Sequence, residues 1–482
     1  MEKEPKYERP KPGPLLNITL FCTALFSVGG LALVMEKPTY SELERRDLAA
    51  MPELTLDNYL SGEFFAGVST FYSDTFPFRD ALVSFGSTLE EMRGLRLDDA
   101  RIHEVAPSQP EPSSEPSSEG GSSSQESSSS AAEEQPATGE QNGSVFIYQG
   151  RAMSMFGGSQ AMGKYYADVI NAYAEALPDV KVYDIIVPTS IEFYLPERYQ
   201  DISAPEKPNI DYIYSQMSDA VTTVDAYSEI AQHTDEYIYF RTDHHWTVTG
   251  AYYAYVAFCE AAGFTPTPYD SFEWNRKEPF YGTLYSQTQD STLYANPDYV
   301  DYPTISTPHQ AYMYRPGTPF TAIPSTVMAD YASGVNMYSV FLHGDLPLTE
   351  VRTNNNTGRS AVVVKESFGN AFSPFLIAHY DTLYIVDQRY FELNLLDFIK
   401  QHGVTDLIFI NNVFAANTNV QIRWIQGLMY QQWTPPAEEE ASSSEESSGD
   451  DPKSGDNESD GEEGDGRDRE KDSRSSDEEA DE

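Results

Sequence analysis

One junction in the sequence carries side chains that could move protons. The run RTDHHW at 241–246 places Asp243 before His244 and His245, ahead of a stretch that is predicted to be helical. A carboxylate beside a histidine can fix its tautomer and stabilise the imidazolium, and a histidine beside a serine can take the serine's proton. Ser367 lies between a buried apolar run and a helical stretch, a context that exposes a hydroxyl at the top of a sheet. These residue types together indicate nucleophilic catalysis by a serine.

Groups that could stabilise a developing negative charge also fall near Ser367. Main-chain N–H groups at the start of the following helical stretch could bind an oxyanion. Asn411 and Asn412 end another apolar run and could supply a side-chain amide to the same oxyanion. The motif around the serine is E-S-F-G-N, so it differs from the G-x-S-x-G nucleophile elbow.

The same residues allow other interpretations. His244 could be structural or contact a substrate, and Arg389 could bind substrate or be a satisfied surface cation. A metal-dependent phosphoesterase could use Asp243 and the two histidines, but adjacent side chains rarely converge on one ion, so we expect no metal and no cofactor. A serine at a strand end is often only a turn or cap residue. A non-catalytic protein that retains the fold therefore stays open, and the geometry of Ser367 and His245 would decide.

The elements that must position these residues follow from apolar periodicity and turn residues. Helices are expected at 163–177, 247–263, 368–380 and 393–403. Strands are expected at 181–188, 233–240, 360–367, 381–387 and 405–412, with a hairpin at 144–153. Residues 265–355 are polar and rich in Pro and Tyr, and we expect a long excursion with short strands there. Thr247 or Thr249 could cap the helix at 247–263, and Gly263 could close it.

Alternating strands and helices in the last third predict an α/β fold with a parallel sheet flanked by helices. Ligand sites in such sheets lie beyond the C-terminal ends of the strands. Ser367, the turn 387–389 and the pair Asn411 and Asn412 all fall at such ends. This coincidence predicts a functional site at that edge of the sheet.

The charge of the chain is strongly acidic and unevenly distributed. Of 482 residues, 76 are acidic and 31 are basic, which gives a net charge of −45. Residues 437–482 carry a net −16, and residues 101–143, which are mostly Ser, Glu, Pro, Gln and Gly, carry −7. Both segments lack the apolar content that repays ordering entropy, so we expect a disordered linker and a disordered acidic tail. The remainder is still about −22, so nucleic acid is excluded as a partner bound through its phosphates.

An apolar run near the N-terminus predicts a membrane anchor. Residues 15–35 contain no charge and are long enough to cross a bilayer as a helix. The basic tail 1–14 favours a cytoplasmic N-terminus, with the chain extracytoplasmic after residue 36. A cleaved signal peptide is the alternative, but no clean A-x-A site ends the run. Cys22 lies in this run and Cys259 beyond it, so a disulfide scaffold and a cysteine-based zinc site are excluded.

Two stretches between these segments can fold, a helical part at 36–100 and the α/β domain at 144–436. Here the sequence resembles the DHHW family, which is related to alginate O-acetylation proteins with an SGNH-hydrolase-like catalytic domain. The resemblance covers most of 36–100 and 144–433. It is carried by SGEFFAGVSTFYSDTFPFRD, TDHHWTVTGAYYAY, KESFGNAFSPF and IVDQRYF.

The resemblance implies a circularly permuted SGNH-hydrolase-like sheet, because Asp-His precedes the serine in this chain. It implies that Ser367 is the nucleophile, His245 the base and Asp243 the acid that orients the base. Asn411 or Asn412 would stand where SGNH enzymes keep an oxyanion-binding asparagine. The implied activity is O-acetyl transfer to, or removal from, a cell-surface or exported polysaccharide. The family context also implies a membrane-bound O-acyltransferase as the donor partner.

Overall fold

The computed structural model describes residues 144–434 without a break, and shorter pieces before them. These pieces are 19–23, 26–27, 30–32, 35, 37–41, 46–55, 58–59, 63–79, 82 and 100–103. The predicted cytoplasmic tail at 1–14, the linker from 104 to 143 and the acidic tail at 437–482 lie outside the described residues.

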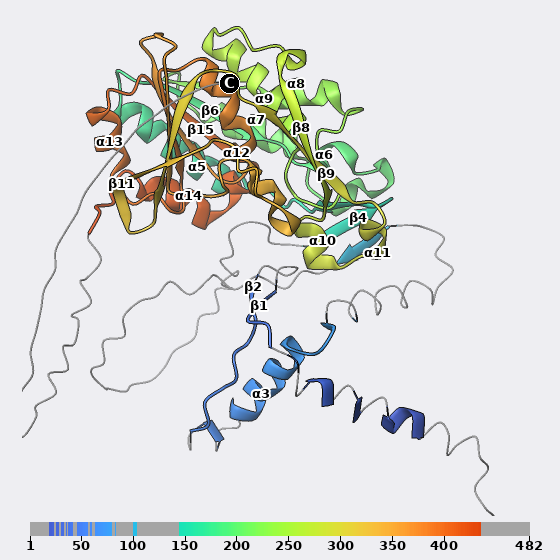
Figure 1. The fold of residues 1–482 in the computed structure, drawn as a ribbon. Helices are drawn as coiled ribbons and strands as arrows, with labels where there is room; N and C mark the ends of the chain where they lie inside the picture. Colours follow the sequence, from blue (N-terminus) through green and yellow to red (C-terminus); the bar gives the residue numbers. More distant parts are fainter. Residues whose placement is uncertain are drawn as a thin grey trace, which may run out of the picture. The chain divides into compact units, whose positions relative to one another are not determined.

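An eight-stranded sheet forms the centre of residues 144–434 (Figure 1). Its order is β11 (Thr318–Ser325), β10 (His309–Arg315), β12 (Leu348–Thr353), β14 (Thr382–Asp387), β13 (Ser360–Lys365), β15 (Asp406–Asn412), β6 (Lys181–Val187) and β7 (Val221–Val224). The strands from β14 to β7 run parallel, whereas β12, β10 and β11 are each antiparallel to their neighbours.

The sheet is therefore mixed, and the prediction of a parallel sheet is wrong at one side. The antiparallel strands come from the stretch 265–355, for which only short strands were expected. Most side chains of β10 and β11 are exposed or half-buried. Antiparallel strands tolerate such exposure, while parallel strands are usually buried on both faces. The polar composition of β10 and β11 therefore did not indicate that they belong to the central sheet.

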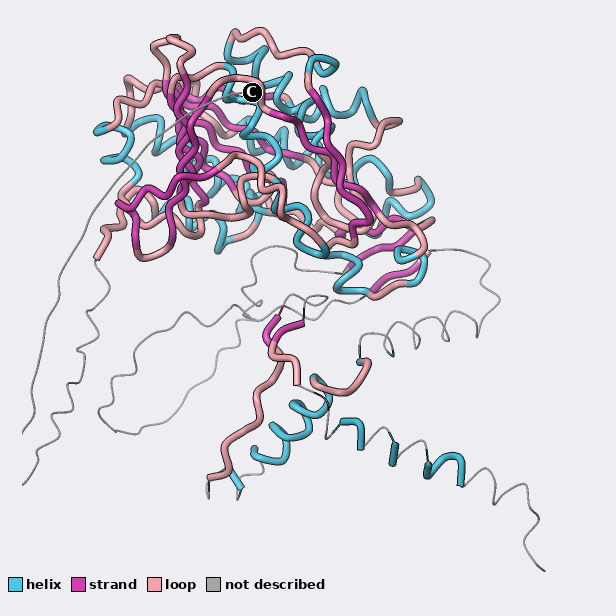
Figure 2. The backbone as a smooth tube through the Cα atoms, in the orientation of Figure 1, coloured by secondary structure: helices cyan, strands magenta, loops and turns pink. Residues whose placement is uncertain are grey.

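Helices cover both faces of the sheet, and each face has its own apolar core (Figure 2). Successive strand residues point to opposite faces, so β13 sends Ala361 and Val363 into one core and Val362 and Val364 into the other. The first core includes residues of α9 (Val248–Ala262) and α12 (Gly369–Phe372). The second includes residues of α5 (Gln160–Ala176), α13 (Leu395–Gln401) and α14 (Asn419–Gly427). The result is a mixed α/β fold in three layers.

The helix after the RTDHHW run forms as predicted. The Thr247 side chain accepts a hydrogen bond from the N–H of Gly250 and caps α9. Gly263 ends α9 with φ +73°, a left-handed conformation that glycine adopts without strain. The predicted helices at 163–177 and 393–403 correspond to α5 and α13. The predicted strands at 181–188, 360–367, 381–387 and 405–412 correspond to β6, β13, β14 and β15.

Smaller elements surround the sheet. The predicted hairpin consists of β4 (Val145–Tyr148) and β5 (Arg151–Ser154), with β3 (Arg101–His103) paired to β4. A second hairpin consists of β8 (Glu273–Phe280) and β9 (Asp298–Thr304). Short helices are α6 (Ser190–Tyr194), α7 (Glu206–Ser215), α8 (Ala226–Ile230), α10 (Thr283–Thr288) and α11 (Ser291–Tyr294), together with the 3-10 helix η4 (Gly334–Val340).

Three predicted boundaries differ from the structure. Residues 233–240 form no strand, since only Tyr239 makes an isolated bridge, to Trp246. The stretch 368–380 contains only α12 and a 3-10 helix, Ser373–Ala378, and Pro374 lies at its start, where a missing N–H is tolerated. Residues 101–103, which were assigned to the linker, pair with β4 instead.

The described N-terminal pieces include α3 (Glu63–Asp74), β1 (Tyr40–Ser41) and β2 (Arg46–Asp47). Helix α3 lies within the stretch 36–100, where a helical part is expected, and much of that stretch lies outside the described residues. Within the predicted anchor at 15–35, residues 19–23, 26–27 and 30–32 are helical. Among the residues that the structure describes, no helix combines the length and the apolar character that a membrane crossing requires.

Candidate active site

Ser367, His245 and Asp243 form one chain of hydrogen bonds. The distance from Ser367 Oγ to His245 Nε2 is 2.7 Å, and that from His245 Nδ1 to Asp243 Oδ1 is 2.6 Å. All three residues are buried, with exposed fractions of 6%, 5% and 1%. The carboxylate accepts from Nδ1–H, so the lone pair of Nε2 faces the hydroxyl. This is the arrangement in which a histidine can take a proton from a serine.

The loop that carries Asp243 and His245 is anchored on both sides. Before it, the Asp298 carboxylate accepts from the N–H and the hydroxyl of Thr242. After it, the Trp246 indole N–H donates to the main-chain oxygen of Phe368 at 3.0 Å. Since Phe368 follows the serine directly, this bond ties the histidine loop to the nucleophile turn although 122 residues separate the two partners.

The Asp243 carboxylate is fully used by donors of this chain. Its Oδ1 accepts from the N–H and Nδ1 of His245, and its Oδ2 accepts from the N–H and hydroxyl of Thr283 at the start of α10. Gly282 permits this approach, because a Cβ there would lie 2.2 Å from the Asp243 Cβ. Four donors fix the plane of the carboxylate and hence the orientation of the His245 ring.

The nucleophile lies in a turn directly after β13. Glu366 is fully buried, and its Oε2 accepts from the N–H of Phe368 at 3.1 Å and lies 3.2 Å from Ser367 Oγ. Its Oε1 accepts from the N–H of Asn412 at 3.0 Å. The Glu366 side chain therefore joins the ends of β13 and β15, which are neighbours in the sheet.

A small pocket of about 20 Å³ adjoins the relay. Its polar wall includes His244, Asn412, Ser154 and Gln421, and its apolar wall includes Phe368, Phe414 and Ala415. The hydroxyl of Ser154 and the Nε2 of Gln421 are buried and have no hydrogen-bond partner in the described part of the chain. Both atoms belong to residues of the pocket wall, but neither is open to solvent.

His244 lies beside the relay rather than within it. Its Nδ1 is 2.5 Å from the hydroxyl of Thr283, and its ring centroid is 3.7 Å from that of His245. Because it lines the pocket, its placement agrees with a substrate contact.

The structure separates the two candidate asparagines. The Asn411 amide donates to the hydroxyl of Tyr166, a buried residue of α5, and Asn411 does not line the pocket. Asn412 does line it. The Asn412 Oδ1 accepts from the N–H of Ala415, and its Nδ2 donates to no group of the described residues. Of the two, Asn412 is therefore the one that lies on the pocket wall.

Arg389 belongs to a partly buried cluster of charges. Its guanidinium contacts Asp387 and Asp345 at 2.8 Å, and the ammonium of Lys365 contacts the same two carboxylates at 2.7 and 3.0 Å. Burial alone would raise the pKa of Asp345, but Arg389 and Lys365 outweigh it and hold that pKa well below its usual range. Arg389 does not line the pocket beside the relay. Its observed partners are therefore structural, and substrate binding by Arg389 gains no support.

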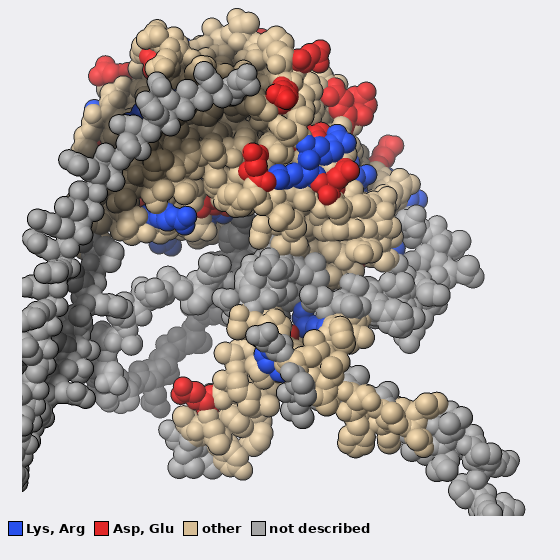
Figure 3. Space-filling model, viewed as in Figure 1, with Lys and Arg blue, Asp and Glu red and all other residues tan. Residues whose placement is uncertain are grey.

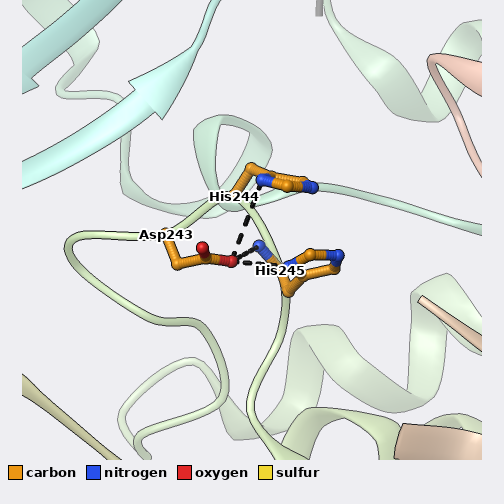
Figure 4. Close-up of side chains that lie close together, drawn as sticks. All are labelled: Asp243, His244 and His245. Atoms are coloured by element: carbon orange, nitrogen blue, oxygen red, sulfur yellow. Dashed lines mark hydrogen bonds and ion pairs between the residues drawn. The ribbon is translucent and has the colours of Figure 1, made fainter. Parts of the chain in front are cut away.

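Asp243, His244 and His245 can also be considered as metal ligands, since one donor atom of each lies within 4.8 Å of the others (Figure 4). In the observed arrangement, however, the donor atoms of Asp243 accept from His245 and Thr283, and His245 Nε2 lies at the serine. A cation would have to replace these bonds. The hydrogen-bonded relay is the simpler account of the geometry.

Sequence reasoning missed the two residues that hold the relay from outside, Tyr338 and Thr283, as well as Ser154 and Gln421 of the pocket wall. Tyr338 of η4 stacks on the His245 ring, and Thr283 of α10 holds Asp243. Both lie in the stretch 265–355, where no periodicity or motif marked them.

Basic side chains form no broad patch on the face of the molecule in Figure 3, where those of the described residues are few and lie beside acidic ones.

Comparisons with known proteins bear on the family and the fold. Residues 44–108 and 117–386, more than half of the chain, match the family model described as DHHW protein. A solved DHHW family protein from Eubacterium siraeum is 33% identical, with a TM-score of 0.55 over 60% of this chain and 96% of that one. A comparison with curated proteins gives no match.

Two further solved structures are more distant. Bacillus cereus PatB1 is 17% identical, with a TM-score of 0.49 over 57% of this chain and 98% of that one. The O-acetyltransferase domain of Pseudomonas putida AlgJ is 16% identical, with a TM-score of 0.35 over 57% and 93%.

Proposed function

The chain belongs to the DHHW family, and we propose that it is a serine O-acetyltransferase or acetylesterase. The observation that carries the proposal is the chain of hydrogen bonds from Ser367 through His245 to Asp243. A non-catalytic protein of the same fold would have no need to hold a buried hydroxyl 2.7 Å from an oriented imidazole. The geometry thus favours the enzyme over the non-catalytic alternative.

In the proposed reaction, Ser367 Oγ attacks the carbonyl carbon of an acetyl ester while His245 Nε2 takes the hydroxyl proton. Asp243 stabilises the imidazolium that results. The tetrahedral intermediate then collapses, the C–O bond to the leaving alcohol breaks, and His245 returns the proton to that alcohol. A sugar hydroxyl or water attacks the acetyl-serine in the second half, with His245 again acting as base, and Ser367 is regenerated.

The pocket supports a small acyl group. A cavity of 10–15 Å³ by the same measure holds about one water molecule, so about 20 Å³ suits a methyl group better than a sugar ring. The Nδ2 of Asn412 is the side-chain donor that we assign to the oxyanion. A bulky alcohol, such as the hydroxyl of a polysaccharide, would then approach from outside the pocket.

Substrate and location are proposed on other grounds. The resemblance to alginate O-acetylation proteins supports a cell-surface or exported polysaccharide as substrate. The uncharged run at 15–35 supports a single membrane anchor, with the catalytic domain outside the cytoplasm. Under this proposal a membrane-bound O-acyltransferase would supply the acetyl group.

The test is hydrolysis of p-nitrophenyl acetate by wild type and S367A, together with mass spectrometry of the intact protein during turnover. We expect an acetyl adduct on wild type and a loss of activity of about 10³-fold or more in S367A. S360A is the matched control, because Ser360 lies at the opposite end of the same strand and its hydroxyl bonds Gly403. Full activity in S367A would reject the proposal.

The two alternatives give different results. A metal-dependent phosphoesterase would lose activity on treatment with a chelator and would hydrolyse p-nitrophenyl phosphate. A non-catalytic polysaccharide-binding or assembly protein would bind glycans equally well as wild type and S367A and would form no adduct.

A further inference from the structure

The carboxylate of Glu366 makes three contacts around the nucleophile, and the proposed reaction assigns it no step. It bonds the N–H of Phe368 at 3.1 Å and the N–H of Asn412 at 3.0 Å, and it lies 3.2 Å from Ser367 Oγ. Glu366 is completely buried. Burying a carboxylate costs free energy unless hydrogen-bond donors satisfy it. These contacts supply donors to both of its oxygens and so hold the carboxylate in place.

The contacts join two segments that the sheet brings together. Ser367 lies in the turn after β13, and Asn412 is the last residue of β15, which pairs with β13. The pairing of these two strands ends at Lys365 and Ile410, so the residues of the site lie just beyond it. Glu366 supplies the connection that main-chain pairing no longer provides.

Glu366 is not placed to compete with His245 as the base. A serine hydroxyl has one hydrogen, and the distance to His245 Nε2 is 2.7 Å whereas that to Glu366 Oε2 is 3.2 Å. The shorter contact goes to the imidazole, whose tautomer Asp243 fixes. The two main-chain donors, from Phe368 and Asn412, occupy the carboxylate instead.

We infer that Glu366 is a positioning residue that fixes the hydroxyl of Ser367 relative to Asn412 and the oxyanion donor we assign to it. A shift of about 1 Å between nucleophile and oxyanion donor can cost about 10²-fold in rate, while binding of the ground state is little affected. The inference rests on the proposed function for its effect on turnover. Its effect on the reactivity of Ser367 does not depend on the natural substrate.

The experiment compares E366Q and E366D with wild type in two assays. The first measures kcat and KM for p-nitrophenyl acetate, and the second measures the rate at which phenylmethylsulfonyl fluoride modifies Ser367, followed by intact mass. Glutamine keeps the size of the side chain but offers one acceptor where the two N–H groups need two. Aspartate keeps the charge, but its shorter side chain cannot reach both N–H groups at once.

We expect kcat and the modification rate of E366Q to fall together by about 10–100-fold, with KM changed less than about 3-fold. E366D should lie between E366Q and wild type. E350Q is the matched control, because Glu350 is a buried carboxylate of β12 that bonds Tyr314 and Arg352 and does not touch the site. It should retain the modification rate of wild type.

Three results would overturn the inference: wild-type kcat and modification rate in E366Q, a rise in KM alone, or equal losses in E366Q and E350Q. If E366Q does not fold, E366D decides, since wild-type rates in both assays would show that joining the two N–H groups is dispensable. If wild type shows no turnover that depends on Ser367, the proposed function fails. The modification rates still test Glu366 in that case.

Discussion

The ring of Tyr338 lies flat on the imidazole of His245, with centroids 4.0 Å apart and planes 12° from parallel. Its hydroxyl donates to the main-chain oxygen of Ser367 at 3.2 Å. Burial raises the pKa of Tyr338 well above its usual range, so the hydroxyl remains a donor. One side chain of η4 thus contacts both the base and the nucleophile, from a part of the chain that no motif marked.

Two substitutions of Tyr338 test the ring contact with His245 and the hydrogen bond to Ser367 separately. Y338F keeps the stacked ring and loses one hydrogen bond, so we expect kcat within about 3-fold of wild type and a loss of about 1 kcal/mol in unfolding free energy. Y338L removes the flat surface under the imidazole, and kcat should fall by about 10-fold or more. Steady-state kinetics with p-nitrophenyl acetate and urea unfolding measure both effects. Equal kcat values for Y338F and Y338L would show that the stacking does not orient the base.

Replacing Asp243 by asparagine tests the orienting carboxylate. An amide at this position can stabilise the wrong tautomer of His245, and we expect kcat to fall by about 10³–10⁴-fold. T283V is the matched control, because it removes one donor to Asp243 Oδ2 and leaves the contact with His245 intact. We expect its kcat to fall by about 10-fold at most. A D243N protein that folds normally and keeps more than a tenth of the wild-type kcat would contradict the assignment.

The two neighbouring asparagines should behave differently. N412A removes the donor that faces the pocket, and we expect a decrease in kcat of about 10²–10³-fold. N411A removes the bond to Tyr166 inside the second core, so it should lower the unfolding free energy by about 1–3 kcal/mol and leave the kcat of the folded protein within about 3-fold. Kinetics and urea unfolding on both variants decide, and a larger kinetic loss in N411A would reverse the assignment.

Much of the parallel half of the fold could be predicted because its strands are short apolar runs that alternate with helices. Adjacent parallel strands bring their C-terminal ends to one edge, so Ser367 and Asn412 could be expected there without knowledge of the strand order. The grouping of Ser367 with His245 needed the resemblance as well, since the two residues lie far apart in the sequence and in different elements.

The rest of the site depends on polar contacts that leave no periodic signal. Thr283 and Tyr338 enter the site through short helices in the stretch 265–355. Tyr338 belongs to the first core, whereas the buried residues of α10, which carries Thr283, pack against the hairpin β4–β5. The two asparagines at the end of β15 could not be told apart by type. Only the alternation of side chains across the strand decides that Asn411 points to Tyr166 and Asn412 to the pocket.

Arg389 offers a direct contrast between a structural and a substrate-binding role. R389M would remove one of the two cations that face the carboxylates of Asp345 and Asp387. These would keep Lys365, the Asn370 amide and the main-chain N–H of residue 389 as partners, and breaking a buried ion network costs about 3–5 kcal/mol. We expect a large drop in unfolding free energy and a KM within about 2-fold of wild type for the folded enzyme. A KM raised 10-fold with unchanged stability would restore the substrate-binding hypothesis.

Glu206 provides a pH test of the loop that forms one wall of the pocket. Its carboxyl group is completely buried, and its oxygens contact the N–H and hydroxyl of Thr189, a residue of the pocket wall. Burial raises its pKa from 4.5 to about 8, so the folded protein holds this proton more tightly than the unfolded chain does. The contribution of the protonated Glu206 to the unfolding free energy is therefore fully present below about pH 4.5 and is lost as pH rises through about 8.

Glutamine at position 206 resembles the protonated carboxyl group and does not titrate. E206Q should match wild type near pH 5 and exceed it at pH 9 by on the order of 3–5 kcal/mol in unfolding free energy. Urea unfolding at pH 5, 7 and 9 measures the difference. The reference is E350Q, a buried carboxylate paired with Arg352, whose loss should not stabilise the protein at high pH. If the wild-type and E206Q stabilities differ by the same amount at all three pH values, Glu206 does not retain its proton in the folded protein.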